Sequence, residues 1–225
     1  LETLSGAPRF NRWMAETVAP FLGRRVLEIG AGIGNLTRHL ARRRERYIAT
    51  DIDEEHLARL RTRLQHRPNL EIRRVDVTDP ADFRELAGAV DTVVCLNVLE
   101  HIEDDLTGLK NLHGALVPGG RAIVLVPQGP EIYGTLDASL GHYRRYLRSE
   151  LQARMTEAGF RLERLIEFNR AARPGWYLNG RLLRRSTISP LQLRIFDRLV
   201  WLWKRVDPFL PWPPTSLIAI GLKPT

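Results

Sequence analysis

The chain has 225 residues, of which 44% are hydrophobic and 27% are charged, and it carries a net charge of +8. This length suits a single α/β domain over residues 1–225 with a core of its own. The lone Cys95 excludes a disulfide framework and a cysteine-ligated iron–sulfur cluster. With no apolar run of about 18 residues, no repeat and no secretory leader, we expect a cytoplasmic protein.

The positive charge is concentrated in the second part of the sequence. Residues 1–138 contain 18 Arg and Lys against 20 Asp and Glu, a balance of −2, whereas residues 139–225 contain 16 against 6, a balance of +10. Such an asymmetry favours an acidic partner: nucleic acid, an anionic membrane surface or a phosphorylated substrate. A soluble, arginine-rich surface without a partner is the alternative.

The predicted elements start with a buried strand over residues 26–29, and a glycine-rich turn follows it at once. Gly30, Gly32 and Gly34 stand at every second position, and a helical period begins at Leu36. Glycines suit this place because the chain must turn tightly and let a ligand approach the bare backbone. A purely structural glycine turn is the alternative.

The spacing of these glycines separates two classes of cofactor. A dinucleotide fingerprint requires G-x-G-x-x-G, and its third glycine position holds Asn35 here. The form present, G-x-G-x-G preceded by the acid Glu28, resembles motif I of the class I S-adenosylmethionine-dependent methyltransferases. The resemblance implies an α/β fold with a Rossmann-like, mostly parallel sheet of seven strands, helices on both faces and an antiparallel last strand. It also implies S-adenosyl-L-methionine as cofactor, bound by Glu28 and the three glycines, and S-adenosyl-L-homocysteine as product.

The second predicted strand, residues 46–50, ends at Asp51, Ile52 and Asp53, and a helix with an apolar face follows. An acid about 20 residues after the glycine turn, at the tip of this strand, can accept hydrogen bonds from both ribose hydroxyls. We therefore assign Asp51, with its neighbour Ile52, to the cofactor. Asp53 is assigned to the N-cap of the helix.

The third predicted strand, residues 70–75, ends at Asp76 and Val77. The family resemblance implies that Asp76 binds the adenine amino group of the cofactor and that the backbone amide of Val77 binds a ring nitrogen. A solvated turn aspartate is the alternative for Asp76 taken singly.

The fourth predicted strand, residues 91–96, leads into Asn97 and then Glu100-His101 at the start of the next helical region. The resemblance implies that Asn97 lines the cofactor. Some relatives bind a divalent ion through Glu-x-x-Glu-His, but Asn97 replaces the first glutamate, and a neutral amide is a poor ligand for a hard cation. We therefore expect no metal site, with Glu100 and His101 capping or bracing the helix.

The loop after the fifth predicted strand, residues 121–126, is the predicted substrate region, because ligands of open α/β sheets lie beyond the carboxyl ends of the strands. His142 is the only residue of this loop whose ordinary pKa lies near neutrality, which suits a proton acceptor for a hydroxyl. A structural histidine bonded to a loop carbonyl is the alternative. Two tyrosines are expected as pocket walls and one of two arginines as an anion contact: Tyr133, Tyr143, Arg144 and Arg145.

An insertion of 46 residues, 169–214, separates the sixth predicted strand, 161–168, from the seventh, 215–222. It holds four of the five tryptophans. Within it, residues 190–206 plot as one amphipathic helix with tryptophans, aliphatic residues and arginines. Such a helix suits a peripheral membrane contact or a lipid-like substrate; ordinary packing on the domain is the alternative.

These patterns predict an enzyme that transfers a methyl group from S-adenosyl-L-methionine to a small-molecule acceptor. A hydroxyl is the favoured acceptor, and an apolar or phosphate-bearing acceptor stays open. One alternative is an RNA methyltransferase, favoured by the basic second part, although no RNP1-like motif or Asn-Pro-Pro-Tyr segment is found and no nucleic-acid partner is expected. The other is a non-catalytic protein that binds S-adenosylmethionine. The oligomeric state stays open.

Overall fold

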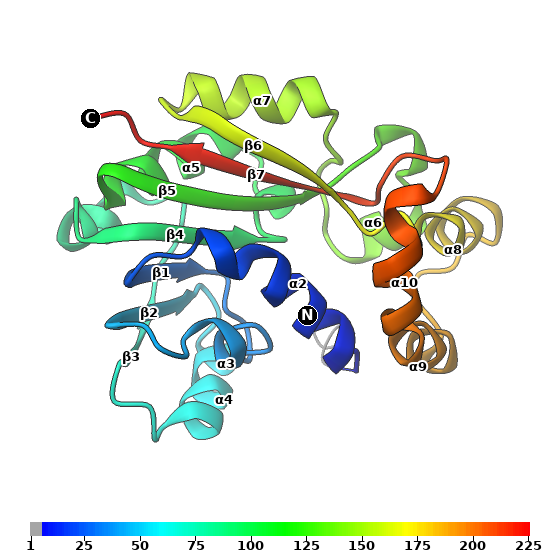
Figure 1. Cartoon of the computed structure of the whole chain (residues 1–225), viewed down its shortest axis with the longest axis horizontal. Coiled ribbons are helices and arrows are strands. Elements are labelled where there is room, and N and C mark those ends of the chain that lie inside the picture. Colours follow the sequence, from blue (N-terminus) through cyan, green and yellow to red (C-terminus); the bar gives the residue numbers. More distant parts are fainter. Residues whose placement is uncertain (1–5) are drawn as a thin grey trace.

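A computed structural model describes residues 6–225 of the chain (Figure 1). Its strands are β1 (Arg25–Ile29), β2 (Arg46–Asp51), β3 (Leu70–Arg74), β4 (Val90–Leu96), β5 (Leu116–Pro127), β6 (Arg161–Phe168) and β7 (Ser216–Leu222). They form one seven-stranded sheet in the order β3-β2-β1-β4-β5-β7-β6. The first five strands pair in parallel, and β7 lies antiparallel between β5 and β6. The predicted fold class is confirmed.

Helices cover both faces of this sheet. They are α2 (Pro8–Val18), α3 (Thr37–Leu40), α4 (Glu54–Leu64), α5 (Asp105–Ala115), α6 (Thr135–Ser139), α7 (Arg148–Glu157), α8 (Arg173–Tyr177), α9 (Pro190–Arg198) and α10 (Val200–Val206). One apolar core lies between the sheet and α5 with α7, and a second lies between the sheet and α2 with α4. The strands between these cores are apolar on both faces, as expected of a covered parallel sheet. None of the helices in residues 6–225 is long and apolar enough to cross a membrane.

Several elements differ from the sequence-based expectation: α6 and α8 were not predicted, and β5 begins at Leu116 rather than at residue 121. The helix expected after the glycine turn is the single turn α3, after which Arg43 adopts a left-handed conformation with φ 60° and the chain reverses toward β2. The helix expected over residues 190–206 is two helices, α9 and α10, which break at Leu199. The helix α2 was not predicted.

The insertion packs against α2 at the end of the molecule where α8, α9 and α10 gather (Figure 1). The buried carboxylate of Asp197 on α9 accepts hydrogen bonds from the backbone N–H groups of Arg9 and Phe10, at 2.8 and 2.9 Å. These are N–H groups of the first turn of α2, which have no partner within the helix. Phe10 also contacts the ring of Phe196 on α9, with ring centroids 5.7 Å apart. The insertion therefore fixes the start of α2.

Candidate active site

The glycine turn lies directly beyond the carboxyl end of β1. Gly30, Gly32 and Gly34 all have positive φ angles, of 72°, 54° and 83°, which side chains disfavour. Neighbouring groups also leave no room for a side chain at two of them. A Cβ at Gly30 would lie 2.3 Å from Cγ2 of Val98, and a Cβ at Gly34 would lie 2.4 Å from Cδ1 of Leu60. The turn is therefore built as bare backbone facing the carboxyl edge of the sheet.

Asp51, at the end of β2, braces this turn. Its buried carboxylate accepts a hydrogen bond from the Gly32 backbone N–H at 2.7 Å and another from the Asp53 N–H at 3.0 Å. Each oxygen accepts one of these bonds and keeps a further lone pair. Asp53 accepts from the backbone N–H groups of Glu55 and His56, which confirms the predicted N-cap of α4. Between the two acids, the Ile52 side chain is exposed at the same edge.

Glu28 is buried in β1, two residues before the glycine turn. Its Oε2 atom accepts hydrogen bonds from the hydroxyls of Thr37 and Tyr47, at 2.6 and 3.0 Å. Burial raises the pKa of Glu28 from 4.5 to about 7, against the opposing effect of these two bonds. Glu28 lines a narrow pocket of about 40 Å³ together with Gly30, Asn97 and residues of α2. The other lining residues come from the end of β1, the glycine turn, the residues after it and the end of β4.

The raised pKa of Glu28 predicts a stability that depends on pH. Because the folded chain holds this proton more tightly than the unfolded chain, the stabilisation is complete below pH 4.5 and is lost as the pH rises through about 7. A shift of this size corresponds to roughly 3 kcal/mol at most. Glu28→Gln should therefore gain stability relative to the wild type between pH 4.5 and 8, measured as the free energy of unfolding in urea. Glu45→Gln, at an exposed glutamate, is the control, and parallel curves for Glu28→Gln and the wild type would contradict the expectation.

Asp76 and Asn97 follow the next two strands at the same edge of the sheet. Asp76 comes after β3, and its Oδ1 atom accepts from the backbone N–H and the hydroxyl of Thr78, at 2.9 and 2.7 Å. Asn97 comes after β4 with a φ of 57°, a conformation that is uncommon outside glycine, and lines the pocket beside Glu28. Val77, which follows Asp76, is buried. The structure thus brings the predicted cofactor residues to neighbouring strand ends.

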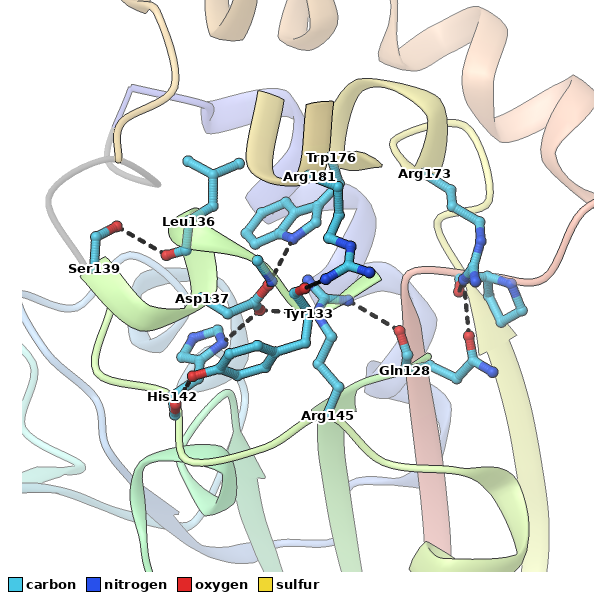
Figure 2. A network of polar contacts seen from close by, with 12 residues as sticks. Gln128, Tyr133, Leu136, Asp137, Ser139, His142, Arg145, Arg173, Trp176 and Arg181 are labelled. Atoms are coloured by element: carbon cyan, nitrogen blue, oxygen red, sulfur yellow. Dashed lines mark hydrogen bonds and ion pairs between the residues drawn. The ribbon is translucent and has the colours of Figure 1, made fainter. Parts of the chain in front are cut away.

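The segment between β5 and α7, called the substrate loop from here on, is organised around a carboxylate that the sequence analysis did not single out. Asp137, on α6, is fully buried, and its Oδ1 atom lies 3.0 Å from Nδ1 of His142 (Figure 2). It also accepts from Nε of Arg145 at 2.8 Å, from Nε1 of Trp176 at 3.1 Å and from the Gly134 backbone N–H at 3.1 Å. Burial alone raises the pKa of Asp137, but the His142 bond and the Arg145 charge outweigh it and hold the pKa below its ordinary value. The carboxylate is therefore ionised.

Arg144 and Arg145, the predicted anion contacts, are both engaged within the protein. The Arg145 guanidinium is 4% exposed, pairs with Asp137 and stacks over Trp176 at 4.7 Å. Arg144 pairs with the buried carboxylate of Asp105 at 3.2 Å. Ion pairs with buried acids engage both guanidinium groups, and an anion contact at either residue stays a prediction.

The two tyrosines of the loop lie in different surroundings. Tyr133 is half-buried, and its hydroxyl donates to the backbone carbonyl of His142 at 2.7 Å (Figure 2). Tyr143 is exposed, and its backbone N–H donates to the Glu100 carbonyl at 2.7 Å. Tyr133 therefore fixes the backbone at His142, and Tyr143 connects the loop to the segment after β4.

Glu100, His101 and His142 come together at the end of β4. One nitrogen or oxygen atom from each lies within 4.8 Å of the others, an arrangement that could hold a metal ion. The rings of His101 and His142 meet edge to face with centroids 4.8 Å apart. Glu100 is buried, its Oε2 atom has no hydrogen-bond partner in residues 6–225, and burial raises its pKa to about 8.

We nevertheless expect methyl transfer by this chain to need no divalent ion. The Glu100 carboxyl is mainly protonated at neutral pH, and a neutral acid is a weak ligand for a hard cation. Asn97 adds only an amide at this edge. Metal analysis of the purified protein should show no stoichiometric ion, and dialysis against EDTA should leave turnover unchanged. Activity that is lost in EDTA and restored by Mg²⁺ or Zn²⁺ would refute this expectation.

The parallel strands carry the glycine turn and the acids at their carboxyl ends, and the antiparallel β7 lies between β5 and β6. This arrangement is a Rossmann-like methyltransferase fold. A family model described as a methyltransferase domain matches residues 27–122, from β1 into β5. The S-adenosylmethionine-dependent methyltransferase from Mesorhizobium loti shares the fold, with a TM-score of 0.66 over 97% of this chain and 99% of that one, at 15% identity.

Two curated relatives agree with this result. The chain is 28% identical over 183 residues to the ubiquinone biosynthesis O-methyltransferase of Acinetobacter baylyi, which covers 73% of this chain and 75% of that protein. It is 29% identical over 170 residues to the protein of the same name from Pseudomonas aeruginosa, covering 68% and 71%. These comparisons support an S-adenosylmethionine-dependent methyltransferase with S-adenosyl-L-methionine as its cofactor.

Proposed function

We propose that this chain transfers a methyl group to a hydroxyl of a small-molecule acceptor, with His142 as the residue that takes the proton. The relatives named above are O-methyltransferases by name, which supports a small-molecule acceptor and an oxygen as the acceptor atom. The cofactor supplies an electrophilic methyl group on a positively charged sulfur. The protein must then align the acceptor, exclude water and remove the hydroxyl proton.

The cofactor contacts in this proposal are those predicted from the sequence. Asp51 accepts hydrogen bonds from the ribose hydroxyls through the lone pairs that its two backbone contacts leave free. Asp76 and Val77 bind the adenine, and the exposed Ile52 packs against it. The bare backbone of the glycine turn admits the rest of the cofactor, with Glu28 and Asn97 lining the inner end of its site.

The observation that carries the catalytic proposal is the 3.0 Å contact between Nδ1 of His142 and the buried carboxylate of Asp137. An ionised carboxylate accepts, so Nδ1 carries the proton and Nε2 keeps the lone pair that a base requires. Asp137 acts as a positioning residue that fixes the tautomer and the ring. The contact of His142 with Glu100 and His101 puts its ring against the segment that follows β4, and Asn97, at the start of that segment, lines the pocket beside Glu28.

The test is incubation of the purified chain with methyl-labelled S-adenosyl-L-methionine and a metabolite extract of the source cell. We expect label in a small molecule, in a bond that resists mild alkali, as an ether does and an ester does not. Label in the RNA fraction would instead support the RNA methyltransferase alternative. Cofactor binding without labelled product in any fraction would support the non-catalytic one.

We also propose that residues 190–206 make peripheral contact with a membrane or a lipid-like substrate. Support comes from Leu191, 65% exposed, and from the exposed Ile195 and Trp201 on a basic segment. Leu191→Asp with Ile195→Asp should reduce sedimentation of the chain with anionic vesicles at least severalfold. Leu147→Asp, at the exposed residue that precedes α7, is the control and should not reduce it. Equal sedimentation of all three proteins would count against this contact. A cytoplasmic location stays a prediction.

A further inference from the structure

A cavity of about 360 Å³ lies between the substrate loop and the insertion. Its wall combines residues from both segments: Gly134, Thr135, Tyr177, Gly180, Arg181, Leu182 and Arg184. The volume is in the range of small-molecule sites, and no residue assigned so far to the cofactor or to proton transfer lines it. The cavity is therefore a separate feature that the function described above does not explain.

Two arginines of this wall have no acidic partner in the part of the chain that the structure describes. Arg181 donates from Nη1 to the Tyr133 carbonyl at 3.2 Å, as Figure 2 shows, and Arg184 is exposed. The insertion as a whole has nine basic residues against two acidic ones, Asp197 and Asp207. Both acids are buried and accept backbone N–H groups elsewhere. The positive charge at the cavity is thus uncompensated and favours an anion.

Two other residues of the wall have large, mainly apolar side chains. Tyr177 and Leu182 are large hydrophobic residues on this wall and are 44% and 61% exposed. Water-exposed apolar groups beside two guanidinium groups match a ligand with an anionic end and an apolar body. A small inorganic anion would use the arginines and leave the apolar part of the wall uncovered.

The backbone around the cavity is constrained by close contacts. A Cβ at Gly134 would lie 2.5 Å from the Gly180 carbonyl oxygen, so the loop and the insertion touch backbone to backbone. The hydroxyl of Thr135 lies within hydrogen-bond distance of the carbonyls of Gly180 and Arg185, at 3.1 and 2.6 Å. Gly180 lies in a π-helix (Leu178–Leu182), and Arg184 has a φ of 48°. Short π-helices and left-handed residues other than glycine occur often at functional sites.

One carboxylate connects this cavity to the proposed base. The Gly134 backbone N–H, on the cavity wall, donates to Oδ2 of Asp137, and Oδ1 of the same carboxylate contacts Nδ1 of His142. These contacts measure 3.1 and 3.0 Å, so the wall and the base stand on either side of a single side chain. The Asp137 side chain is therefore the direct connection between the cavity wall and the proposed base.

We propose that this cavity binds the anionic end of an amphiphilic acceptor, with Arg181 and Arg184 on a carboxylate or phosphate and with Tyr177 and Leu182 on the apolar body. The assignment rests on the proposed function, since it makes the cavity part of the acceptor site. It adds a second candidate anion contact to the one that the sequence analysis expected at Arg144 or Arg145.

Calorimetry on the full chain with S-adenosyl-L-homocysteine present tests this assignment with four probes: hexyl phosphate, hexanoate, hexanol and inorganic phosphate. Hexyl phosphate or hexanoate should bind at one site per chain, and the comparison of the two shows which anion is preferred. Hexanol and inorganic phosphate should each bind at least roughly tenfold more weakly. Hexanol lacks the anionic group, and inorganic phosphate lacks the apolar body.

The double variant Arg181→Gln with Arg184→Gln should weaken binding of the preferred anion roughly tenfold or more. The matched control is Arg42→Gln with Arg161→Gln, which removes the same charge from exposed positions that do not line the cavity and should change nothing. Leu182→Asn is a second variant, expected to weaken hexyl phosphate and to leave inorganic phosphate unaffected. Binding by neither amphiphilic anion, or equal losses in the two double variants, would overturn the proposal.

These measurements need no turnover, so they separate this assignment from the proposed function. Probe binding that depends on Arg181 and Arg184, in a chain that methylates no hydroxyl, would keep the anion site and reject O-methylation. Methylated product from a chain that binds no probe would do the reverse. His142→Ala should leave probe binding unchanged, because His142 does not line the cavity.

Discussion

Replacing Asp51 by alanine should abolish binding of S-adenosyl-L-methionine at the concentrations that saturate the wild type. The carboxylate holds the Gly32 N–H at 2.7 Å and the Asp53 N–H at 3.0 Å, so its loss releases the glycine turn. It also removes the proposed acceptor for the ribose hydroxyls. Hydrogen bonds to a charged group contribute about 1.5–3 kcal/mol each, so losing two ribose bonds lowers affinity at least a hundredfold. Calorimetry with S-adenosyl-L-homocysteine measures this loss directly.

The chain offers a matched control two residues away. Asp53→Ala removes an acid of the same size from the same edge, but the contacts of Asp53 are with α4, which it caps and where it lies 3.7 Å from Nδ1 of His56. It should cost about 1 kcal/mol of stability and leave affinity within a factor of a few. Similar affinities for the Asp51 variant and the wild type would reject Asp51 as the ribose ligand. Similar losses in the two variants would mean that the acids act through the fold rather than through the cofactor.

The strand ends were predictable because they combine two local signals. A short apolar run indicates a buried strand, and the residue after it must lie at the carboxyl edge of a parallel sheet. Asp51, Asp76 and Asn97 could thus be brought to one edge without knowledge of any distance between them. The Asp53 cap is equally local, since it needs only its own helix.

The position of the substrate loop could be predicted in this way, but the contacts of its side chains could not. The sequence shows charged residues in a row at Arg144 and Arg145, but it does not show that Arg145 is buried against Asp137. Asp137 lies on a helix of five residues inside a segment rich in helix breakers, so no periodicity marks it. Its contact with Trp176 joins positions 39 residues apart, which no spacing rule predicts.

The insertion was misjudged for a similar reason. A period of 3.6 residues over 190–206 records which side chains share a face, but it does not record the break at Leu199. It also does not show that Phe196 packs against α2 or that Asp197 accepts a hydrogen bond from its first turn. A contact with a distant helix that was itself not predicted leaves no trace in the local pattern.

His142→Ala should keep cofactor binding and reduce turnover by roughly a hundredfold to ten-thousandfold, the usual contribution of a general base. Asp137→Asn should lower kcat with little change in KM, because an amide cannot fix the tautomer as an ionised carboxylate does. That variant also leaves the buried guanidinium of Arg145 without its charge partner, so its fold must be checked by circular dichroism. Trp176→Phe, which removes one hydrogen bond to Asp137 and keeps the ion pair, is the milder test of the same positioning role.

The His142 variant also separates a base from a merely structural histidine. The backbone of His142 is held independently of its ring: its N–H donates to the Asp137 carbonyl at 3.0 Å, and its carbonyl accepts from the Tyr133 hydroxyl at 2.7 Å. Alanine keeps both contacts, so the loop should keep its path when the imidazole is removed. A folded variant that binds cofactor and has lost turnover therefore reports on the ring itself. Normal turnover in that variant would mean that the acceptor proton leaves by another route and that the ring only braces Asp137.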